Sequence, residues 1–358
     1  MQYNIPITKT TNSKLSEIDF DNIPFGATFS DHMFMADYID GEWTNLQIVP
    51  FGNFEISPVN LALHYGQSIF EGMKASKMEN GKPAFFRPEM HIERLNASAR
   101  RMMMAELPKD LFLQSLHELV ALDSNWIPPA EGSALYIRPF MFATGEKLGV
   151  SVSETYKYIV VTGPVGPYYP KPVKLLAEDK YVRAAEGGVG EAKTAGNYAA
   201  SLLPAAEAKK KGYDQVMWLD SKEFKYIQEV GTMNIFMVIG NKVITPSTNG
   251  AILKGITRNT LIQVMESKGY TVEERNISID ELAAAYDAGE LKEMFGTGTA
   301  AVVANVAEVK YKDKVMVLPP AEDQTIANML RNEINQMRSG KIEDTFNWIV
   351  PVKSTVSV

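Results

Sequence analysis

The order of hydrophobic and polar positions predicts a mixture of strands and helices in the first half of the chain. Residues 81–86 (GKPAFF) lead into Arg87-Pro88, and a proline suits the first helical position because its missing N–H would have no helical partner there. The residues that follow place four apolar side chains on one helical stripe: Leu95, Ala99, Met102 and Met103. The methionine run at 102–104 is interpreted as core filling. Strands are expected at Ala134–Ile137 and Tyr156–Thr162.

The second half also mixes strands with helices, without the strict alternation of a doubly wound sheet. A short buried strand is expected at Gln215–Leu219, and a hairpin turn at Gly240-Asn241 joins two more apolar runs. Thr257 opens a helix that ends at Lys268-Gly269, and Ser278 with Glu281 forms a capping box ahead of another. A last amphipathic helix, ending at Gly340, contains these apolar positions: Ile326, Met329, Leu330, Ile334 and Met337.

A segment rich in proline and glycine divides these two halves. Residues 163–172 (GPVGPYYPKP) contain four Pro and two Gly, which interrupt both regular structures. The length of 358 residues suggests two domains, at roughly 150 residues each. We therefore predict an α+β fold with a small N-terminal domain at 1–165, a linker at 166–176 and a larger C-terminal domain at 177–358.

Composition narrows the class of function. The formal net charge is −7, so the chain has no general attraction to nucleic acid or to an anionic membrane. There is no cysteine, which excludes disulfides, thiolate metal sites and cysteine nucleophiles and suits a reducing cytoplasm. Apolar runs are too short to span a bilayer, and the first residues lack the apolar core of a secretory signal. We expect a cytoplasmic protein that acts on small molecules.

The densest candidate for chemistry is GGVGEAKTAGNY at residues 187–198. It approaches a phosphate-binding P-loop, but Ala192 stands where that motif needs glycine before the lysine, and no buried strand precedes it. Taken alone, the segment could equally be a surface loop with a solvated Lys193. A nucleotide-binding P-loop protein therefore stays open only as a distant alternative.

Three weaker motifs follow it. QEVGTMNIF (228–236) carries Glu229, either an edge residue or the partner of a buried cation. LKGITRNTL (253–261) begins a helix, whose first amides form an anion site, and FGTGTA (295–300) is a turn with hydroxyls and amides. The four histidines (32, 64, 91 and 117) lack the spacing of a zinc site, and no G-x-S-x-G motif suggests a serine hydrolase.

Eight motifs in this order resemble those of the branched-chain amino-acid aminotransferases, pyridoxal-phosphate enzymes of fold type IV. They are HYGQSIFEGMKA (64–75), FRPEMHIERL (86–95), LYIRPF (135–140), LGVS (148–151), GGVGEAKTAGNY, EVGTMNIF, ILKGITR (252–258) and FGTGTAAVV (295–303). The resemblance covers the chain from Phe25 to the C-terminal helix. It implies reversible amino transfer from Leu, Ile or Val to 2-oxoglutarate, in a site between the two domains.

The resemblance assigns the cofactor's ligands residue by residue. Lys193 becomes the Schiff-base lysine and proton shuttle, Glu229 the partner of the pyridine nitrogen, and Tyr198 the partner of the ring O3′. The glycines before the lysine are interpreted as close packing around the cofactor. The remaining expected ligands hold the phosphate or the ring: Arg94, Leu253, Ile256, Thr257 and Thr299.

The resemblance also implies a substrate pocket and a homodimer in which the partner's loop closes the site. Arg138 is expected to bind the second carboxylate of glutamate, and the turn amides near Thr232 and Ala300 the α-carboxylate. The apolar wall is expected to consist of Phe25, Tyr65, Phe70, Tyr136, Val150 and Tyr168.

Alternatives within the fold share the catalytic residues. A D-amino-acid aminotransferase or an aminodeoxychorismate lyase would keep Lys193 and Glu229, while the stretch Tyr136-Ile137-Arg138 favours the branched-chain activity. A non-catalytic binding protein of this fold is a further alternative. Vertebrate members carry a Cys-x-x-Cys where this chain has Ala301 and Ala304, so thiol redox regulation is excluded.

Overall fold

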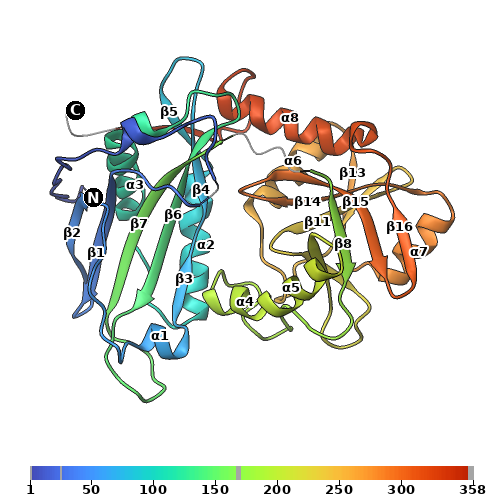
Figure 1. The fold of residues 1–358 in the computed structure, drawn as a ribbon, viewed down its shortest axis with the longest axis horizontal. Coiled ribbons are helices and arrows are strands. Elements are labelled where there is room, and N and C mark those ends of the chain that lie inside the picture. The colour runs from blue at the N-terminus through green and yellow to red at the C-terminus, as the bar shows by residue number, and fades with distance from the viewer. Residues whose placement is uncertain (1, 25, 167–170, 354–358) are drawn as a thin grey trace. The chain divides into compact units, whose positions relative to one another are not determined.

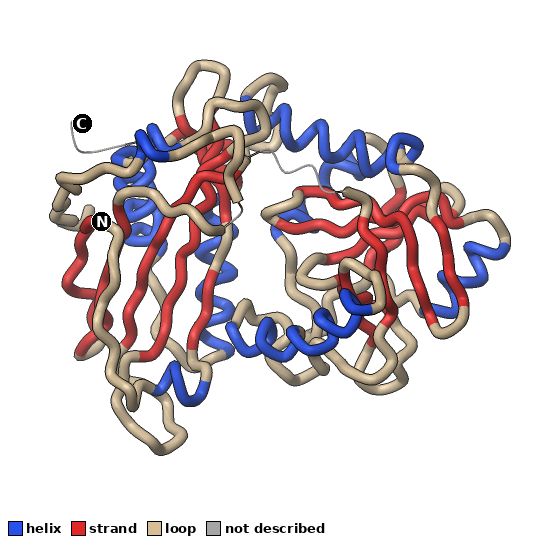
Figure 2. The backbone as a smooth tube through the Cα atoms, in the orientation of Figure 1, coloured by secondary structure: helices blue, strands red, loops and turns tan. Residues whose placement is uncertain are grey.

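The computed structural model describes residues 2–24, 26–166 and 171–353, which fold into two compact units (Figure 1). The first unit comprises Met1–Tyr168, Ala192–Ala195 and Asn335–Val358, and the second comprises Tyr169–Glu191 and Gly196–Ile334. Strands and helices occur in both units, which confirms the predicted α+β class (Figure 2). None of the helices in these ranges is long and apolar enough to span a membrane.

The described part of the first unit contains an eight-stranded sheet with the order β17-β5-β4-β6-β7-β1-β2, and β3 pairs with β6 beside this path. These strands pair antiparallel throughout. In the long β6–β7 ladder, Tyr136 lies opposite Gly163 and Arg138 opposite Val161. The strands are β1 (His32–Ile39), β2 (Glu42–Pro50), β3 (Ser68–Phe70), β4 (Met73–Lys77), β5 (Pro83–Phe86), β6 (Ala134–Ala143), β7 (Tyr156–Val165) and β17 (Ile349–Pro351).

Helices of the first unit pack on this sheet through a common core. Leu95, Leu116 and Phe34, from α2, α3 and β1, are fully buried in one cluster. Pro88 begins α2, as predicted, but the helix ends at Arg101. Met103 follows with φ 51° and is exposed, whereas Met104 is buried in the core and Met102 packs against it. The helices are η1 (Leu15–Glu17), α1 (Leu61–Tyr65), α2 (Pro88–Arg101), α3 (Lys109–Leu122) and η2 (Ser124–Trp126).

The second unit, in its described residues, is built on a nine-stranded mixed sheet. The strand order is β10-β9-β8-β15-β14-β11-β12-β13, and β16 pairs with β15 beside this path. The β8–β9, β8–β15 and β12–β13 pairs are parallel, which is why helices connect several of its strands. The strands are β8 (Val173–Ala177), β9 (Gln215–Leu219), β10 (Ile227–Val230), β11 (Asn234–Ile239), β12 (Lys242–Thr245), β13 (Thr271–Glu274), β14 (Leu291–Gly298), β15 (Val302–Tyr311) and β16 (Lys314–Val317).

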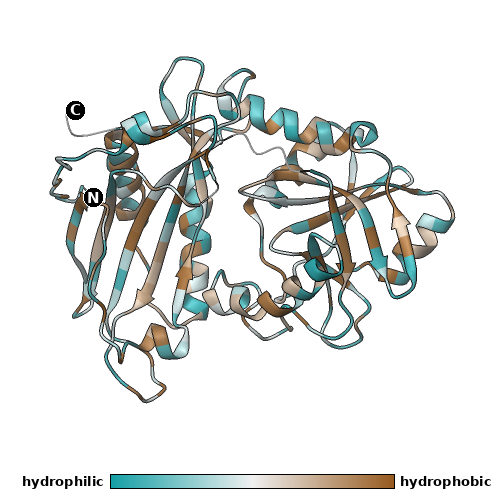
Figure 3. Cartoon of the chain, in the orientation of Figure 1, coloured by the Kyte–Doolittle hydropathy of each residue, from teal (hydrophilic) through white to brown (hydrophobic). Residues whose placement is uncertain are grey.

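A buried carboxylate anchors the last helix of this unit. Glu293 on β14 is 4% exposed and accepts hydrogen bonds from the amides of Ile326 (3.0 Å) and Ala327 (2.9 Å). A negative charge at these amides also complements the helix dipole. The helix carries both hydrophobic and hydrophilic positions (Figure 3). The helices are α4 (Ala195–Ala200), α5 (Leu202–Lys210), α6 (Ile256–Ser267), α7 (Ile279–Asp287), η3 (Ala321–Asp323) and α8 (Thr325–Ser339).

Several local predictions are confirmed. Strands β11 and β12 form the expected hairpin, with Gly240 at φ 59° in its turn. The Ser278 side chain accepts a hydrogen bond from the Glu281 amide at 3.0 Å, which caps α7. Helix α8 ends before Gly340, whose φ of 74° few other residues tolerate.

The division of the chain differs from the single break predicted at 166–176. Strand β8 occupies Val173–Ala177 because the proline-rich run ends at Pro172 and an apolar stretch follows. Two segments placed by sequence in the C-terminal domain, Ala192–Ala195 and Asn335–Val358, belong to the first unit. Their contacts with residues more than 90 positions away cannot be read from local composition.

Candidate functional site

The segment that carries Lys193 is fixed within the first unit by backbone hydrogen bonds. The Lys193 amide donates to Ser98 Oγ at 2.9 Å, and its carbonyl accepts from the Phe70 amide at 3.0 Å. Thr194 Oγ1 donates to the carbonyl of Ser68 at 2.7 Å. Strand β3 and helix α2 therefore hold the lysine backbone from two sides, so the side chain starts from a rigid base.

The Lys193 ammonium group lies over an aromatic ring and near other cations. Its Nζ is 4.7 Å from the centroid of the Phe70 ring. Removal from water lowers the pKa of Lys193 from 10.5 to about 8, and the positive charge of Arg94 contributes to this lowering. Glu71 opposes this effect. A substantial fraction of the side chain is therefore a neutral amine at physiological pH, which is the nucleophilic form.

A buried carboxylate that the sequence analysis did not select holds Arg94. Glu71 is fully buried and accepts from Arg94 Nε (2.7 Å) and Nη2 (2.8 Å). His91 Nδ1 lies 2.7 Å from Glu71 Oε2. Burial raises the pKa of a carboxyl, but here Arg94 and His91 outweigh it and hold the pKa of Glu71 well below its usual range. The sequence did carry a signal for this buried carboxylate. Glu71 lies inside the apolar motif SIFEGM, and a charge that becomes buried needs a partner.

Two predicted substrate residues meet in one cavity of the first unit. Tyr136 and Arg138 line it together, and Arg138 Nη2 donates to Tyr136 Oη at 3.1 Å. The Arg138 guanidinium also lies 4.7 Å above the Phe70 ring. The cavity has a volume of about 160 Å³ and is otherwise lined by Gly26, Thr28, Phe29 and residues 161–165. One cation on aromatic and apolar walls can hold either a carboxylate or a hydrocarbon chain.

Three other predicted wall residues, Tyr65, Phe70 and Val150, are not among the residues that line this cavity. Phe70 instead lies beneath the Arg138 guanidinium and Lys193 Nζ. Tyr65 is 41% exposed and donates its hydroxyl hydrogen to the Leu148 carbonyl, and Val150 is 84% exposed. Both lie in the first unit, on α1 and on the segment between β6 and β7. Phe25 and Tyr168 lie outside the described residues.

Glu229 in the second unit has the buried cation that would distinguish it from a simple edge residue. Arg183 Nε lies 2.5 Å from Glu229 Oε2, and the two side chains are 9% and 4% exposed. Asn234 Nδ2 donates to Glu229 Oε1 at 3.0 Å and to the Leu253 carbonyl at 2.9 Å. A guanidinium and an amide therefore both contact this buried carboxylate. Arg183 and Asn234 were not selected from the sequence.

The predicted cofactor residues Tyr198, Glu229 and Leu253 line one cavity of the second unit together with Thr232. Ile256 and Thr257 begin α6, after Gly255, where a Cβ atom would lie 1.9 Å from Asn234 Oδ1. The first amides of α6 have no acceptor within the helix, which makes its N-terminus suited to an anion. Thr299 and Ala300 form the turn between β14 and β15.

The glycine-rich approach to Lys193 has a structural explanation. A Cβ atom on Gly190 would lie 2.3 Å from the carbonyl oxygen of Ala251, so only glycine allows this contact. Arg183 Nη2 donates to the carbonyls of both residues, which links the loop to the Glu229 ion pair. The turn at 187–192 is therefore packed against protein backbone at Gly190.

Residues 68–309 match the protein family described as amino-transferase class IV, a range that contains Lys193, Arg94 and Glu229. The chain belongs to this family. A Staphylococcus epidermidis protein named "probable branched-chain-amino-acid aminotransferase" is 49% identical over 339 residues, covering 93% of this chain and 94% of the relative. The Bacillus subtilis branched-chain-amino-acid aminotransferase 2 is 45% identical over 346 residues, covering 96% and 95%.

A solved structure shares the fold of this class IV aminotransferase. The branched-chain amino acid aminotransferase of Escherichia coli superposes with a TM-score of 0.72 at 25% identity. The match covers 90% of this chain and 99% of the Escherichia coli chain. The fold type IV architecture predicted from the motifs is thereby confirmed.

The donors of this class IV aminotransferase fit pyridoxal phosphate. A lysine with a pKa of about 8 can react with an aldehyde, and a buried carboxylate can pair with a protonated pyridine nitrogen. Arg94 and the N-terminus of α6 provide positive electrostatic potential for a phosphate. These are the three interactions that the aldehyde, ring nitrogen and phosphate of the cofactor require.

Proposed function

We propose that this protein is a branched-chain amino-acid aminotransferase, which transfers the amino group of leucine, isoleucine or valine reversibly to 2-oxoglutarate with pyridoxal 5′-phosphate. Relatives with that name match more than nine-tenths of the chain at 45–49% identity. The observation that carries the proposal is the Lys193 amine, held over Phe70 beside Arg94 with a pKa of about 8. We also propose a cytoplasmic location, on the cysteine-free composition.

The proposal assigns each cofactor-binding role to residues of the two units. Lys193 Nζ would bind the aldehyde carbon, and Glu229, held by Arg183 and Asn234, would keep the pyridine nitrogen protonated. When bound, the cofactor withdraws electrons from the carbon that carries the transferred nitrogen. Its other proposed ligands are Arg94, Tyr198, Leu253, Ile256, Thr257 and Thr299.

Lys193 is also the proposed proton carrier. Its Nζ would accept the α-proton of the amino acid and would then donate it during the amino transfer that the bound cofactor supports. A neutral amine is needed for the first step, and a pKa of about 8 supplies it near neutral pH. Lys193→Ala should therefore abolish turnover.

The Arg138 cavity is the proposed place of the substrate side chain. Its apolar surfaces suit an isobutyl or sec-butyl group, and the Arg138 guanidinium suits the second carboxylate of glutamate. Amides near Thr232 and Ala300 are the proposed partners of the α-carboxylate. Further wall positions are proposed from the motif match alone: Phe25, Tyr65, Phe70, Val150 and Tyr168.

The direct test is a product assay with purified holoenzyme. L-leucine and 2-oxoglutarate should give glutamate and the branched 2-oxo acid, while Lys193→Ala should give neither. Lys254→Ala is the matched control, since that lysine is exposed and paired with Glu191 at 3.7 Å. Amino transfer from D-alanine but not from L-leucine would reassign the substrate within the same fold. No transfer from either would overturn the proposal.

We further propose that the protein is a homodimer. Apolar side chains of the first unit stand exposed near the predicted substrate residues: Leu63 is 62%, Leu148 65%, Val150 84% and Val152 52% exposed. Exposed apolar groups gathered in this way favour a protein partner, and a second copy would remove them from water.

Size-exclusion chromatography coupled to light scattering, which measures the molar mass in solution, tests this proposal. The wild type should have twice the 39.7 kDa mass of the chain, and Val150→Asp should shift it toward the monomer. Val317→Asp, at a position 58% exposed in the second unit, is the control that should remain dimeric. A monomeric wild type, or a dimer that ignores Val150→Asp, would refute the proposed interface.

A further inference from the structure

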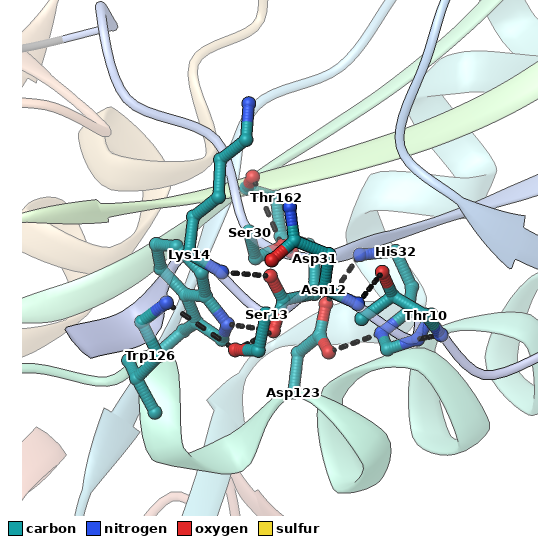
Figure 4. A network of polar contacts seen from close by, with 11 residues as sticks. Thr10, Asn12, Ser13, Lys14, Ser30, Asp31, His32, Asp123, Trp126 and Thr162 are labelled. Atoms are coloured by element: carbon teal, nitrogen blue, oxygen red, sulfur yellow. Dashed lines mark hydrogen bonds and ion pairs between the residues drawn. The ribbon is translucent and has the colours of Figure 1, made fainter. Parts of the chain in front are cut away.

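A polar network, buried at His32 and Asp123 and exposed at Ser13 and Lys14, anchors the loop that forms one wall of the Arg138 cavity (Figure 4). The loop, residues 26–30, contributes Gly26, Thr28 and Phe29 to that wall. It precedes β1 and has no strand or helix hydrogen bonding of its own. Besides the backbone hydrogen bonds from Ala27 to Pro24 and from Ser30 to Thr162, polar side chains next to the loop hold its position.

His32, the first residue of β1 and two positions after the loop, is held at three atoms. Its amide donates to Asp123 Oδ2 at 3.0 Å, and its ring Nδ1 lies 2.6 Å from Asp123 Oδ1. The Thr10 amide donates to the ring Nε2 at 2.9 Å. Because the Thr10 amide donates to Nε2, that nitrogen is an acceptor, and Nδ1 carries the hydrogen that Asp123 receives. His32 and Asp123 are 5% and 2% exposed, so water does not compete for these bonds.

Asp31 forms the second anchor. It accepts from Ser13 Oγ (2.6 Å) and the Lys14 amide (3.0 Å), and from Trp126 Nε1 (3.1 Å). Asp123 ends α3, and Trp126 lies in the following turn η2. The two anchors therefore tie the loop to α3 on one side and to the N-terminal segment on the other, as Figure 4 shows.

The loop also packs closely on β7. The Ser30 amide donates to the Thr162 carbonyl at 2.8 Å, and the two hydroxyl groups are in contact. A Cβ atom at Gly163 would lie 2.2 Å from the Thr28 carbonyl oxygen, so the wall can take this place only beside a glycine. Gly163 faces Tyr136 across the β6–β7 ladder. If His32 or Asp31 lost its hydrogen bonds, the loop could shift on β7, and the width of the cavity beside Tyr136 would change.

We propose that His32 and Asp123, together with Asp31, are positioning residues that hold loop 26–30 in place and so set the fit of substrate side chains in the Arg138 cavity. The inference rests on the proposed function, because it takes the cavity as the substrate's. None of the three residues is among the cavity's lining residues, so they act through the loop.

His32→Gln and Asp31→Ala test the inference, with Gln114→Ala as the matched control. Gln114 also ties the N-terminal segment to α3, through two hydrogen bonds of 2.8 Å with Tyr3, but it does not bond the loop. Each holoenzyme is assayed for kcat and KM with L-leucine and 2-oxoglutarate. Hydrogen exchange of the peptide spanning residues 27–34 is measured by mass spectrometry without substrate.

For His32→Gln and Asp31→Ala we expect KM to rise about ten-fold, while kcat stays within about two-fold of the wild type. The residues proposed to act on the reacting atoms are unchanged, whereas the substrate side chain no longer fits the cavity wall. Exchange of the peptide should accelerate in both, and Gln114→Ala should change neither quantity. If His32→Gln does not fold, the KM and the exchange rate of Asp31→Ala alone test the inference. Unchanged KM in the folded variants, or an equal rise in Gln114→Ala, would overturn the inference. A wild type that does not transaminate leucine would instead overturn the proposed function, while faster exchange would still report the anchoring.

Discussion

The lowered pKa of Lys193 leads to a quantitative prediction about the protein without its cofactor. With the ordinary pKa of 10.5, about one lysine in a thousand is neutral at pH 7.5, whereas with a pKa of about 8 roughly one in four is neutral. Desolvation is the largest cause and Arg94 the next. Replacing Arg94 by glutamine removes a positive charge near the amine and should raise its pKa.

Reductive methylation with formaldehyde measures this amine directly. The cofactor-free protein is treated briefly at a series of pH values, and the peptide containing Lys193 is quantified by mass spectrometry. Methylation should be half-maximal near pH 8 in the wild type and at higher pH in Arg94→Gln. Arg100→Gln is the control on the same helix, because Arg100 is 59% exposed and pairs with an exposed Glu106.

Two results would refute this reasoning. A wild-type midpoint near 10.5 would mean that the amine is solvated, and the neutral nucleophile at physiological pH would be lost. An unchanged midpoint in Arg94→Gln, or an equal shift in Arg100→Gln, would remove Arg94 as the specific cause.

Further predictions concern stability. Arg183→Gln should lower the free energy of unfolding by about 3–5 kcal/mol, because it leaves the buried Glu229 without its cation. Arg275→Gln is the control and should cost less than about 1 kcal/mol, because the ion pair of Arg275 with Glu281 is exposed. Urea unfolding of both variants checks this, and equal losses would contradict it. Burial lowers the pKa of His91 below 6.5, so the unfolded chain binds the proton first and stability should fall as the pH drops below 6.5. In His91→Gln, the free energy of unfolding should fall less steeply between pH 6.5 and about pH 5. His64→Gln, at an exposed position, is the control and should keep the wild-type slope. An equally steep fall in His91→Gln would exclude His91 as its source.

Local sequence patterns predicted the elements whose causes are local. The Gly240 turn, the Ser278 cap and the proline start of α2 each depend on one or two neighbouring residues, and each is present. The end of α2 was missed because apolar spacing alone continued through Met103, although that residue adopts a positive φ. Periodicity describes a face, but it does not fix where a helix stops.

The partners of the candidate site residues could not be predicted in the same way. Glu71 and Arg94 are 23 positions apart, and Arg183 and Glu229 are twice as far, so only the folded chain brings each pair together. The motif match identified Lys193, Arg94 and Glu229 as residues of interest. The charges that tune them emerged from burial and distance, which the sequence does not contain.

In the function proposed above, Lys193 and the bound cofactor pass an amino group from leucine to 2-oxoglutarate. The most direct test is the visible absorption spectrum of the purified protein with pyridoxal phosphate, before and after L-leucine is added. The visible band should fade with L-leucine and return with 2-oxoglutarate, and Lys193→Ala should show no such cycle. A wild-type band that ignores both compounds would contradict the claim.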